Sequence, residues 1–145
     1  MSKEILPKEN IVMHSSVKTK EEAIRESGKV LVNKGYVKED YIDRMFEREE
    51  VTSTYMGNYI AIPHGSEDAK NEVLHSGMSI LRIPEGIDYG DGNEVKIVFG
   101  IAGKNNEHLE ILSQVAIVCS DVDNIEKMLD ASSEEELLQM FSEVG

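Results

Sequence analysis

The sequence predicts an α/β fold in which a mixed β-sheet is flanked by helices, within one domain spanning residues 1–145. Segments with helical periodicity alternate with segments rich in β-branched residues along the chain. Residues 76–83 and 94–103 have the near-continuous apolar character of central strands covered on both faces. A turn signal at Gly57-Asn58 adds an antiparallel pair, so the sheet should be mixed.

The amino-terminal part predicts a short extended segment at residues 11–12, followed by a helix from about 20 to 34. Thr19 and Glu22 have the spacing of a capping box, in which each satisfies a backbone N–H of the first turn. Gly35 supplies a stop at the carboxyl end of this helix.

A second helix is expected over residues 38–50, because two i,i+4 pairs lie on one face: Tyr41/Met45 and Ile42/Phe46. Residues 51–63 then predict two strands joined by a tight turn at Gly57-Asn58. Pro63 cannot donate to a sheet and keeps the preceding residue extended, so the second strand should end where His64 begins.

The second half of the chain predicts two central strands, 76–83 and 94–103, separated by a turn-rich loop over 84–93. A helix beginning near Asn106, with Asn105 or Asn106 as its cap, follows them. Its expected buried positions are Leu109, Leu112, Val115, Ala116 and Cys119. Two more helices are expected, over 123–131 and from Ser133 to about residue 143.

The charge and composition exclude several classes of function. The chain has 28 acidic and 15 basic residues, a formal charge of -13, which disfavours binding to nucleic acid or to an anionic membrane surface. No apolar run is long enough to span a membrane, and the first residues have no apolar leader, so we expect a cytoplasmic protein without direct membrane insertion. The lone cysteine, Cys119, should be a buried apolar residue.

His64 is the leading candidate for chemistry. A strand end, Pro63 before it and Gly65 after it would present its imidazole as an accessible nucleophile, with room for a bulky group or a partner's backbone beside the glycine. His108, in the first turn of a predicted helix, could donate an N–H to an anion, and Arg48 could clamp one with its guanidinium.

Plainer interpretations stay open for each residue. His64 could be a turn histidine, His108 an exposed first-turn residue, and Arg48 a partner of Glu47, Glu49 or Glu50 in surface ion pairs. The hydroxyls of Thr52, Ser53 and Thr54 could donate hydrogen bonds to an anion, or these could be ordinary strand residues.

His14 and His75 should be structural. His64, Glu67 and His75 lack the spacing of a metal site, and residues 86–92 lack that of a nucleotide loop, so neither a metal nor a cofactor is expected.

The ordered motifs resemble enzyme IIA of the mannitol/fructose class of the phosphoenolpyruvate-dependent sugar phosphotransferase system, most of all its mannitol-specific members. They are Glu47-Arg48-Glu49, the run 52–58, the run 60–65 that contains Pro63-His64-Gly65, Glu107-His108-Leu109 and the run 111–113. The likeness covers nearly the whole chain.

The resemblance implies a phosphoryl carrier. His64 would accept the group from the carrier protein HPr and pass it to a IIB domain of a membrane IICB sugar permease, for uptake of mannitol. Arg48 and His108 would stabilise the group during transfer. The alternative is a regulatory module that reports its phosphorylation state to a target protein. A hydrolase that uses His64 with an acidic partner is a third, less favoured, hypothesis.

Overall fold

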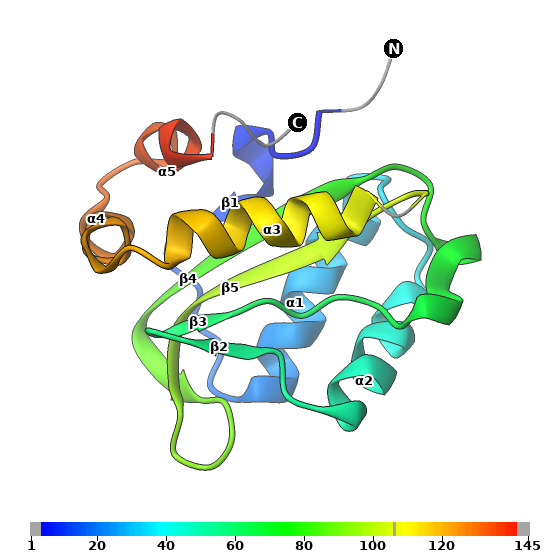
Figure 1. Ribbon diagram of the computed structural model, residues 1–145, viewed down its shortest axis with the longest axis horizontal. Coiled ribbons are helices and arrows are strands. Elements are labelled where there is room, and N and C mark those ends of the chain that lie inside the picture. Colours follow the sequence, from blue (N-terminus) through cyan, green and yellow to red (C-terminus); the bar gives the residue numbers. More distant parts are fainter. Residues whose placement is uncertain (1–3, 106, 142–145) are drawn as a thin grey trace.

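The computed structural model describes residues 4–105 and 107–141, with only the backbone described at 67, 68 and 70. A five-stranded sheet with the strand order β1-β4-β5-β3-β2 forms its centre (Figure 1). Its strands are β1 (Ile11–Val12), β2 (Tyr55–Gly57), β3 (Ile60–Ala61), β4 (Gly77–Asp88) and β5 (Glu94–Ala102). β1 runs parallel to β4 and β3 runs parallel to β5, whereas the β4–β5 and β2–β3 pairs are antiparallel. The predicted α/β fold with a mixed sheet is confirmed.

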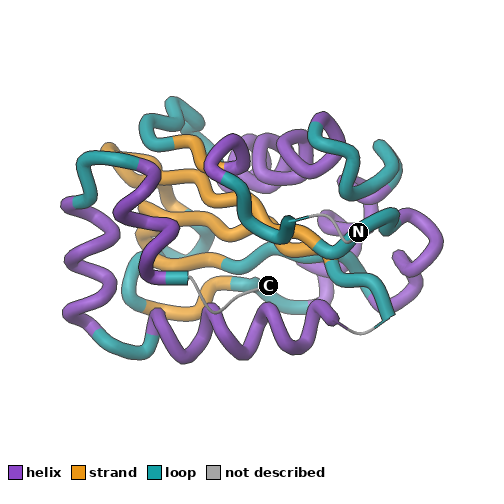
Figure 2. The backbone as a smooth tube through the Cα atoms, turned by 90° about the horizontal axis from the view of Figure 1, so that it is seen from above, coloured by secondary structure: helices purple, strands orange, loops and turns teal. Residues whose placement is uncertain are grey.

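Helices cover both faces of this sheet, as the view from above shows (Figure 2). One face carries α1 (Lys20–Asn33) and α2 (Tyr41–Val51). The other carries α3 (Glu107–Cys119), α4 (Val122–Asp130) and α5 (Glu134–Met140), and short 3₁₀ turns lie at Lys8–Asn10 and Glu67–Glu72. The sheet is therefore the middle layer between two sets of helices.

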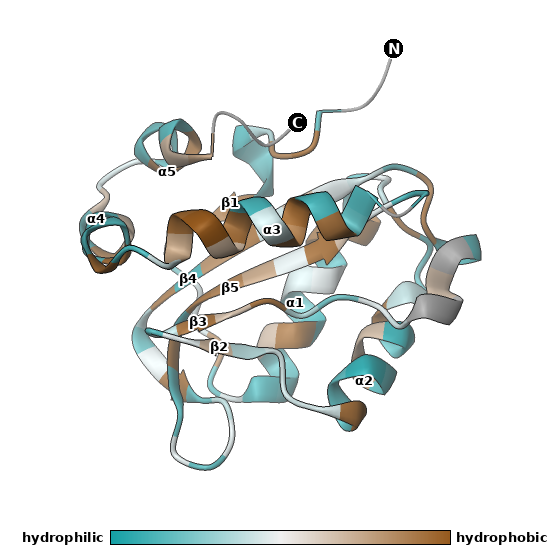
Figure 3. Cartoon of the chain, viewed as in Figure 1, coloured by the Kyte–Doolittle hydropathy of each residue, from teal (hydrophilic) through white to brown (hydrophobic). Residues whose placement is uncertain are grey.

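The central strands β4 and β5 have side chains buried on both faces, because successive residues of a strand point to opposite sides. In β5, Val98 packs into the core under α1 and α2, while Ile97 and Phe99 pack into the core under α3. Figure 3 shows brown, apolar segments in β5 and in the later part of α3, whose first turn is mostly hydrophilic. Central strands covered on both faces were predicted from the apolar runs, and this is confirmed.

Local signals placed the first elements well. Thr19 caps α1 by accepting from the N–H of Glu22, and Gly35, with a φ of 83°, follows its end. The second helix starts at Tyr41 rather than at residue 38. The β2–β3 turn lies one residue later than predicted, at Asn58 and Tyr59, whose φ values of 52° and 72° suit a tight hairpin.

Two expectations for the second half were partly wrong. The first half of the predicted loop over 84–93 is strand, because β4 continues to Asp88 and pairs again with β5 after a register shift, and the loop itself spans 89–93. On α3, Val115 and Cys119 are buried as expected, whereas Leu109 is 59% exposed and Ile111 is buried instead. The expected and the observed sets both fit helical spacing, so periodicity alone could not decide which side of the helix faces the sheet.

The ends of the predicted helices are mostly confirmed. α4 begins after Asp121, whose carboxylate accepts from the N–H of Asp123, and α5 begins after Ser133, which accepts from the N–H of Glu136. Asn106, a predicted cap of α3, and the predicted end of the last helix near residue 143 lie outside the described residues. In the part of the chain that the structure describes, no helix is long and apolar enough to cross a membrane.

Candidate functional site

The site is built where two parallel strands end at the same edge of the sheet. β3 runs parallel to β5, and beyond β3 the chain stays beside β5, since the N–H of Ile101 donates to the carbonyl of Pro63 at 3.0 Å. His64 then forms an isolated parallel bridge with Ile101. Its side chain therefore leaves the sheet next to the carboxyl end of β5, where ligands commonly collect in α/β folds.

A hydrogen bond to the backbone determines which nitrogen of His64 carries a proton. Nδ1 lies 2.8 Å from the carbonyl oxygen of Ile62. A carbonyl oxygen can only accept, so Nδ1 must be the N–H donor, and in the neutral ring Nε2 keeps its lone pair. This contact leaves Nε2 as the ring nitrogen with a free lone pair.

The surroundings of His64 favour the uncharged ring. Burial is the largest influence and lowers its pKa, whereas the Ile62 carbonyl raises it. The positive charge of Arg48 and then that of His108 lower the pKa further, and the negative charge of Glu49 opposes them. The half-buried His64 ring therefore lies within electrostatic reach of both predicted partners, Arg48 and His108.

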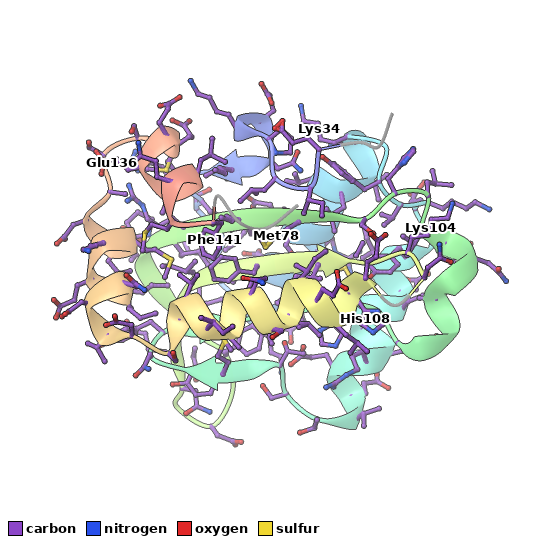
Figure 4. All side chains as sticks on the ribbon, turned by 45° about the horizontal axis from the view of Figure 1, so that its top comes forward. Lys34, Met78, Lys104, His108, Glu136 and Phe141 are labelled. Carbon is purple, nitrogen blue, oxygen red and sulfur yellow. The ribbon has the colours of Figure 1, made fainter. Side chains whose placement is uncertain are left out.

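His108 reaches this region because α3 begins close to the end of β5. A Cβ added to Gly103 would lie 1.9 Å from the backbone nitrogen of His108, so a side chain at 103 would push the two segments apart. Ser76 holds the same turn: its hydroxyl donates to the Glu107 carboxylate at 2.6 Å and accepts from the N–H of Lys104 at 2.9 Å. Figure 4 shows His108 at this end of α3, near Lys104.

Arg48 lies in the last turn of α2 and is half-buried. One of its guanidinium nitrogens donates to the carbonyl of Thr52 at 2.9 Å. Among the described residues Arg48 forms no ion pair, since Glu47 pairs with Arg44 and Glu49 pairs with Lys20. The surface ion pairs considered for Arg48 are therefore not found in this part of the chain, and its remaining N–H groups can face an anion.

Tyr41 supports the backbone of His64, a role that the sequence did not indicate. Its hydroxyl donates to the carbonyl of Ile101 at 2.7 Å and accepts from the N–H of Gly65 at 2.8 Å, which ties both segments together. Burial raises the pKa of Tyr41 to about 12, so the hydroxyl keeps its proton. A Cβ on Gly65 would lie 2.6 Å from the Tyr41 ring. The glycine after His64 thus makes room for Tyr41, rather than for an incoming group.

The other candidates have structural positions. The Thr54 hydroxyl is buried and donates to the Glu49 carboxylate at 2.6 Å, while the Ser53 hydroxyl accepts from the N–H of Tyr55. His14 and His75 are exposed. Cys119 is buried, which raises the pKa of its thiol to about 12 and suits an unreactive core residue. No group of three potential metal ligands lies together within the described ranges.

Comparisons with known proteins show which family the chain is similar to. The family model described as "Phosphoenolpyruvate-dependent sugar phosphotransferase system, EIIA 2" matches residues 4–144. The mannitol-specific phosphotransferase enzyme IIA component of Geobacillus stearothermophilus is 65% identical over 100% of both chains. The component of the same name from Bacillus subtilis is 62% identical over 98% of this chain and 99% of its own.

A solved structure of the same kind is also similar. It is enzyme IIAMTL from Escherichia coli in a complex with phosphorylated enzyme IIBMTL, with a TM-score of 0.89 and 37% identity. The match covers 95% of this chain and 97% of that one.

Titration of the His64 ring tests its electrostatic surroundings. By NMR, its midpoint should lie below the ordinary value of 6.5, and Arg48→Met should raise it because a nearby positive charge is lost. The control is Arg25→Met, since the Arg25 guanidinium lies over the Phe46 ring instead. An unchanged midpoint in Arg48→Met would mean that Arg48 does not act on His64.

Removing the hydroxyl of Tyr41 should loosen the segment that holds His64. Tyr41→Phe leaves the Gly65 N–H and the Ile101 carbonyl without this partner, so the free energy of unfolding should fall by about 1–3 kcal/mol. Urea denaturation measures the change, with Tyr59→Phe, at a residue that is 41% exposed, as the matched control. Equal stability of the two variants would contradict a supporting role for the hydroxyl.

Proposed function

Because the chain belongs to the EIIA 2 family of the phosphoenolpyruvate-dependent sugar phosphotransferase system, and is thus a phosphoryl carrier and phosphotransferase component, we propose that His64 bears the phosphoryl group. Arg48 and His108 stabilise the group during transfer. The observation that carries this assignment is the hydrogen bond from Nδ1 of His64 to the Ile62 carbonyl, which leaves Nε2 as the free nucleophile.

The transfer follows from the tautomer. The Nε2 lone pair of His64 attacks the phosphorus of the donor, a new N–P bond forms, and the donor's bond to phosphorus breaks with its electron pair remaining on the donor. The Nδ1 proton stays in its bond to Ile62. In transfer to the acceptor, the acceptor attacks the phosphorus, and the N–P bond breaks with its electron pair returning to Nε2. The protein's contribution is to align the reacting groups and to stabilise charge on the phosphoryl oxygens.

Arg48 and His108 approach this group from different elements. Arg48 offers guanidinium N–H donors from the end of α2, and His108 lies in the first turn of α3, where the helix dipole favours an anion. Donors placed before reaction need no rearrangement as charge develops.

We propose HPr as the phosphoryl donor and the IIB domain of a membrane IICB permease as the acceptor, with the carrier acting in the cytoplasm. The similar Escherichia coli protein forms a complex with phosphorylated enzyme IIBMTL, which supports the acceptor. The names of the two high-identity relatives support mannitol as the substrate of the permease. They also favour uptake over the alternative of a regulatory module.

Labelling tests the phosphoryl-bearing residue. Incubation with phosphoenolpyruvate, enzyme I and HPr should give one acid-labile, alkali-stable phosphoryl group per chain, detected by mass spectrometry. His64→Ala should lack it, because the ring nitrogen that would carry the group is removed. The control is His75→Ala, which removes an exposed histidine and should be labelled fully. Full labelling of His64→Ala would refute the assignment.

His108 should matter for passing the group on. His108→Ala should still accept phosphate from HPr but transfer it to a IIB domain more slowly, on the order of 100-fold, because a preorganised donor to the phosphoryl oxygens is lost. Rapid-quench measurement of phosphate arriving on IIB gives the rate. Transfer at the wild-type rate would remove His108 from the mechanism.

A further inference from the structure

Glu49 is a buried carboxylate beside the site whose bonds the transfer mechanism does not use. It follows Arg48 directly in α2 and is only 9% exposed. Its oxygens accept from the Thr54 N–H at 2.8 Å, the Thr54 hydroxyl at 2.6 Å and the Tyr89 hydroxyl at 3.3 Å, and one lies 3.1 Å from the Lys20 ammonium. The carboxylate thus joins α2 to α1, to the chain before β2 and to the loop after β4.

The ion pair with Lys20 is largely covered as well. The Lys20 side chain is 23% exposed, and its ammonium lies 4.7 Å from the centre of the Tyr89 ring. A buried ion pair recovers little net stability, because both charges lose their hydration. Its contribution is orientation: the bonds are directional, and the carboxylate satisfies them only when α1, α2 and the 52–54 turn keep their relative positions.

This network and Arg48 hold the same turn from its two sides. Glu49 binds Thr54 from the buried side, and the Arg48 guanidinium donates to the Thr52 carbonyl from the exposed side. Thr54 is itself buried, whereas the Arg48–Thr52 bond is exposed to solvent. The bonds of Glu49 to Thr54 therefore restrain the segment that carries the Thr52 carbonyl, to which one end of the Arg48 side chain is bonded.

We propose that Glu49 is a positioning residue for phosphoryl transfer, which holds the 52–54 turn so that the Arg48 guanidinium stays directed at the group on His64. The inference rests on the proposed function. A direct role in the reaction does not fit, because both carboxylate oxygens already have donors and a negative charge would repel a phosphoryl group.

The test is a double-mutant cycle on the rate of transfer from phospho-HPr. Glu49→Gln keeps the shape but loses the charge that holds Lys20 and Thr54, and should slow transfer on the order of tenfold through misplacement of Arg48. Arg48→Ala should slow it at least as much. Because Glu49 acts through Arg48, the double variant should be no slower than Arg48→Ala alone. Glu50→Gln, an exposed glutamate at the same helix end, is the matched control and should transfer at the wild-type rate.

A second pair of variants covers a failure of Glu49→Gln to fold, which thermal unfolding would reveal. Thr54→Val removes the hydroxyl bonded to Glu49, and Thr54→Ser keeps it. Thr54→Val should slow transfer from phospho-HPr, and Thr54→Ser should transfer at close to the wild-type rate. In an Arg48→Ala background, Thr54→Val should cause no further slowing.

The outcomes separate the two proposals. Wild-type protein that accepts no phosphoryl group overturns the proposed function. If the wild-type protein is labelled, three results overturn only the inference about Glu49: Glu49→Gln transfers as fast as Glu50→Gln, Arg48→Ala transfers at the wild-type rate, or the rate losses of Glu49→Gln and Arg48→Ala multiply in the double variant. Losses that multiply would mean that the effect of Glu49 is structural and independent of Arg48. When the glutamine variant does not fold, the same criteria apply to the Thr54 pair.

Discussion

The hydrogen bond between Nδ1 of His64 and the carbonyl of Ile62 is the constraint on which the site depends. It joins the ring to the backbone carbonyl of the residue two positions earlier. Pro63, between them, favours an extended conformation in the residue that carries this carbonyl. One local contact therefore selects the tautomer and leaves Nε2 facing away from its own backbone.

The rest of the fold brings distant segments to this ring. Parallel pairing of β3 with β5 places His64 beside the start of α3, and close contact at Gly103 lets α3 begin there. Tyr41 bonds the chain after His64 to the end of β5, while the last turn of α2 carries Arg48. The ring is half-buried and held uncharged by this enclosure, yet its cationic neighbours are suited to an anion.

Much of this could be predicted from the sequence because the signals are local. Proline before His64, the cap at Thr19 and the apolar runs of the central strands each act within a few residues. Tyr41 was recognised only as an apolar residue, since its bonds to Gly65 and Ile101 join positions far apart in the chain. Glu49 was grouped with its charged neighbours. Its helical register, four residues after the buried Met45, could have indicated a buried carboxylate. The roles of His64, His108 and Arg48 stay predictions.

The most direct test of the account is the nitrogen that carries the phosphoryl group. Proton–nitrogen correlation NMR of the phosphorylated protein, with labelled histidine rings, distinguishes substitution at Nε2 from substitution at Nδ1. The account predicts phosphorylation at Nε2 of His64 with the Nδ1 proton retained. A phosphoryl group on Nδ1, or on another histidine, would contradict it.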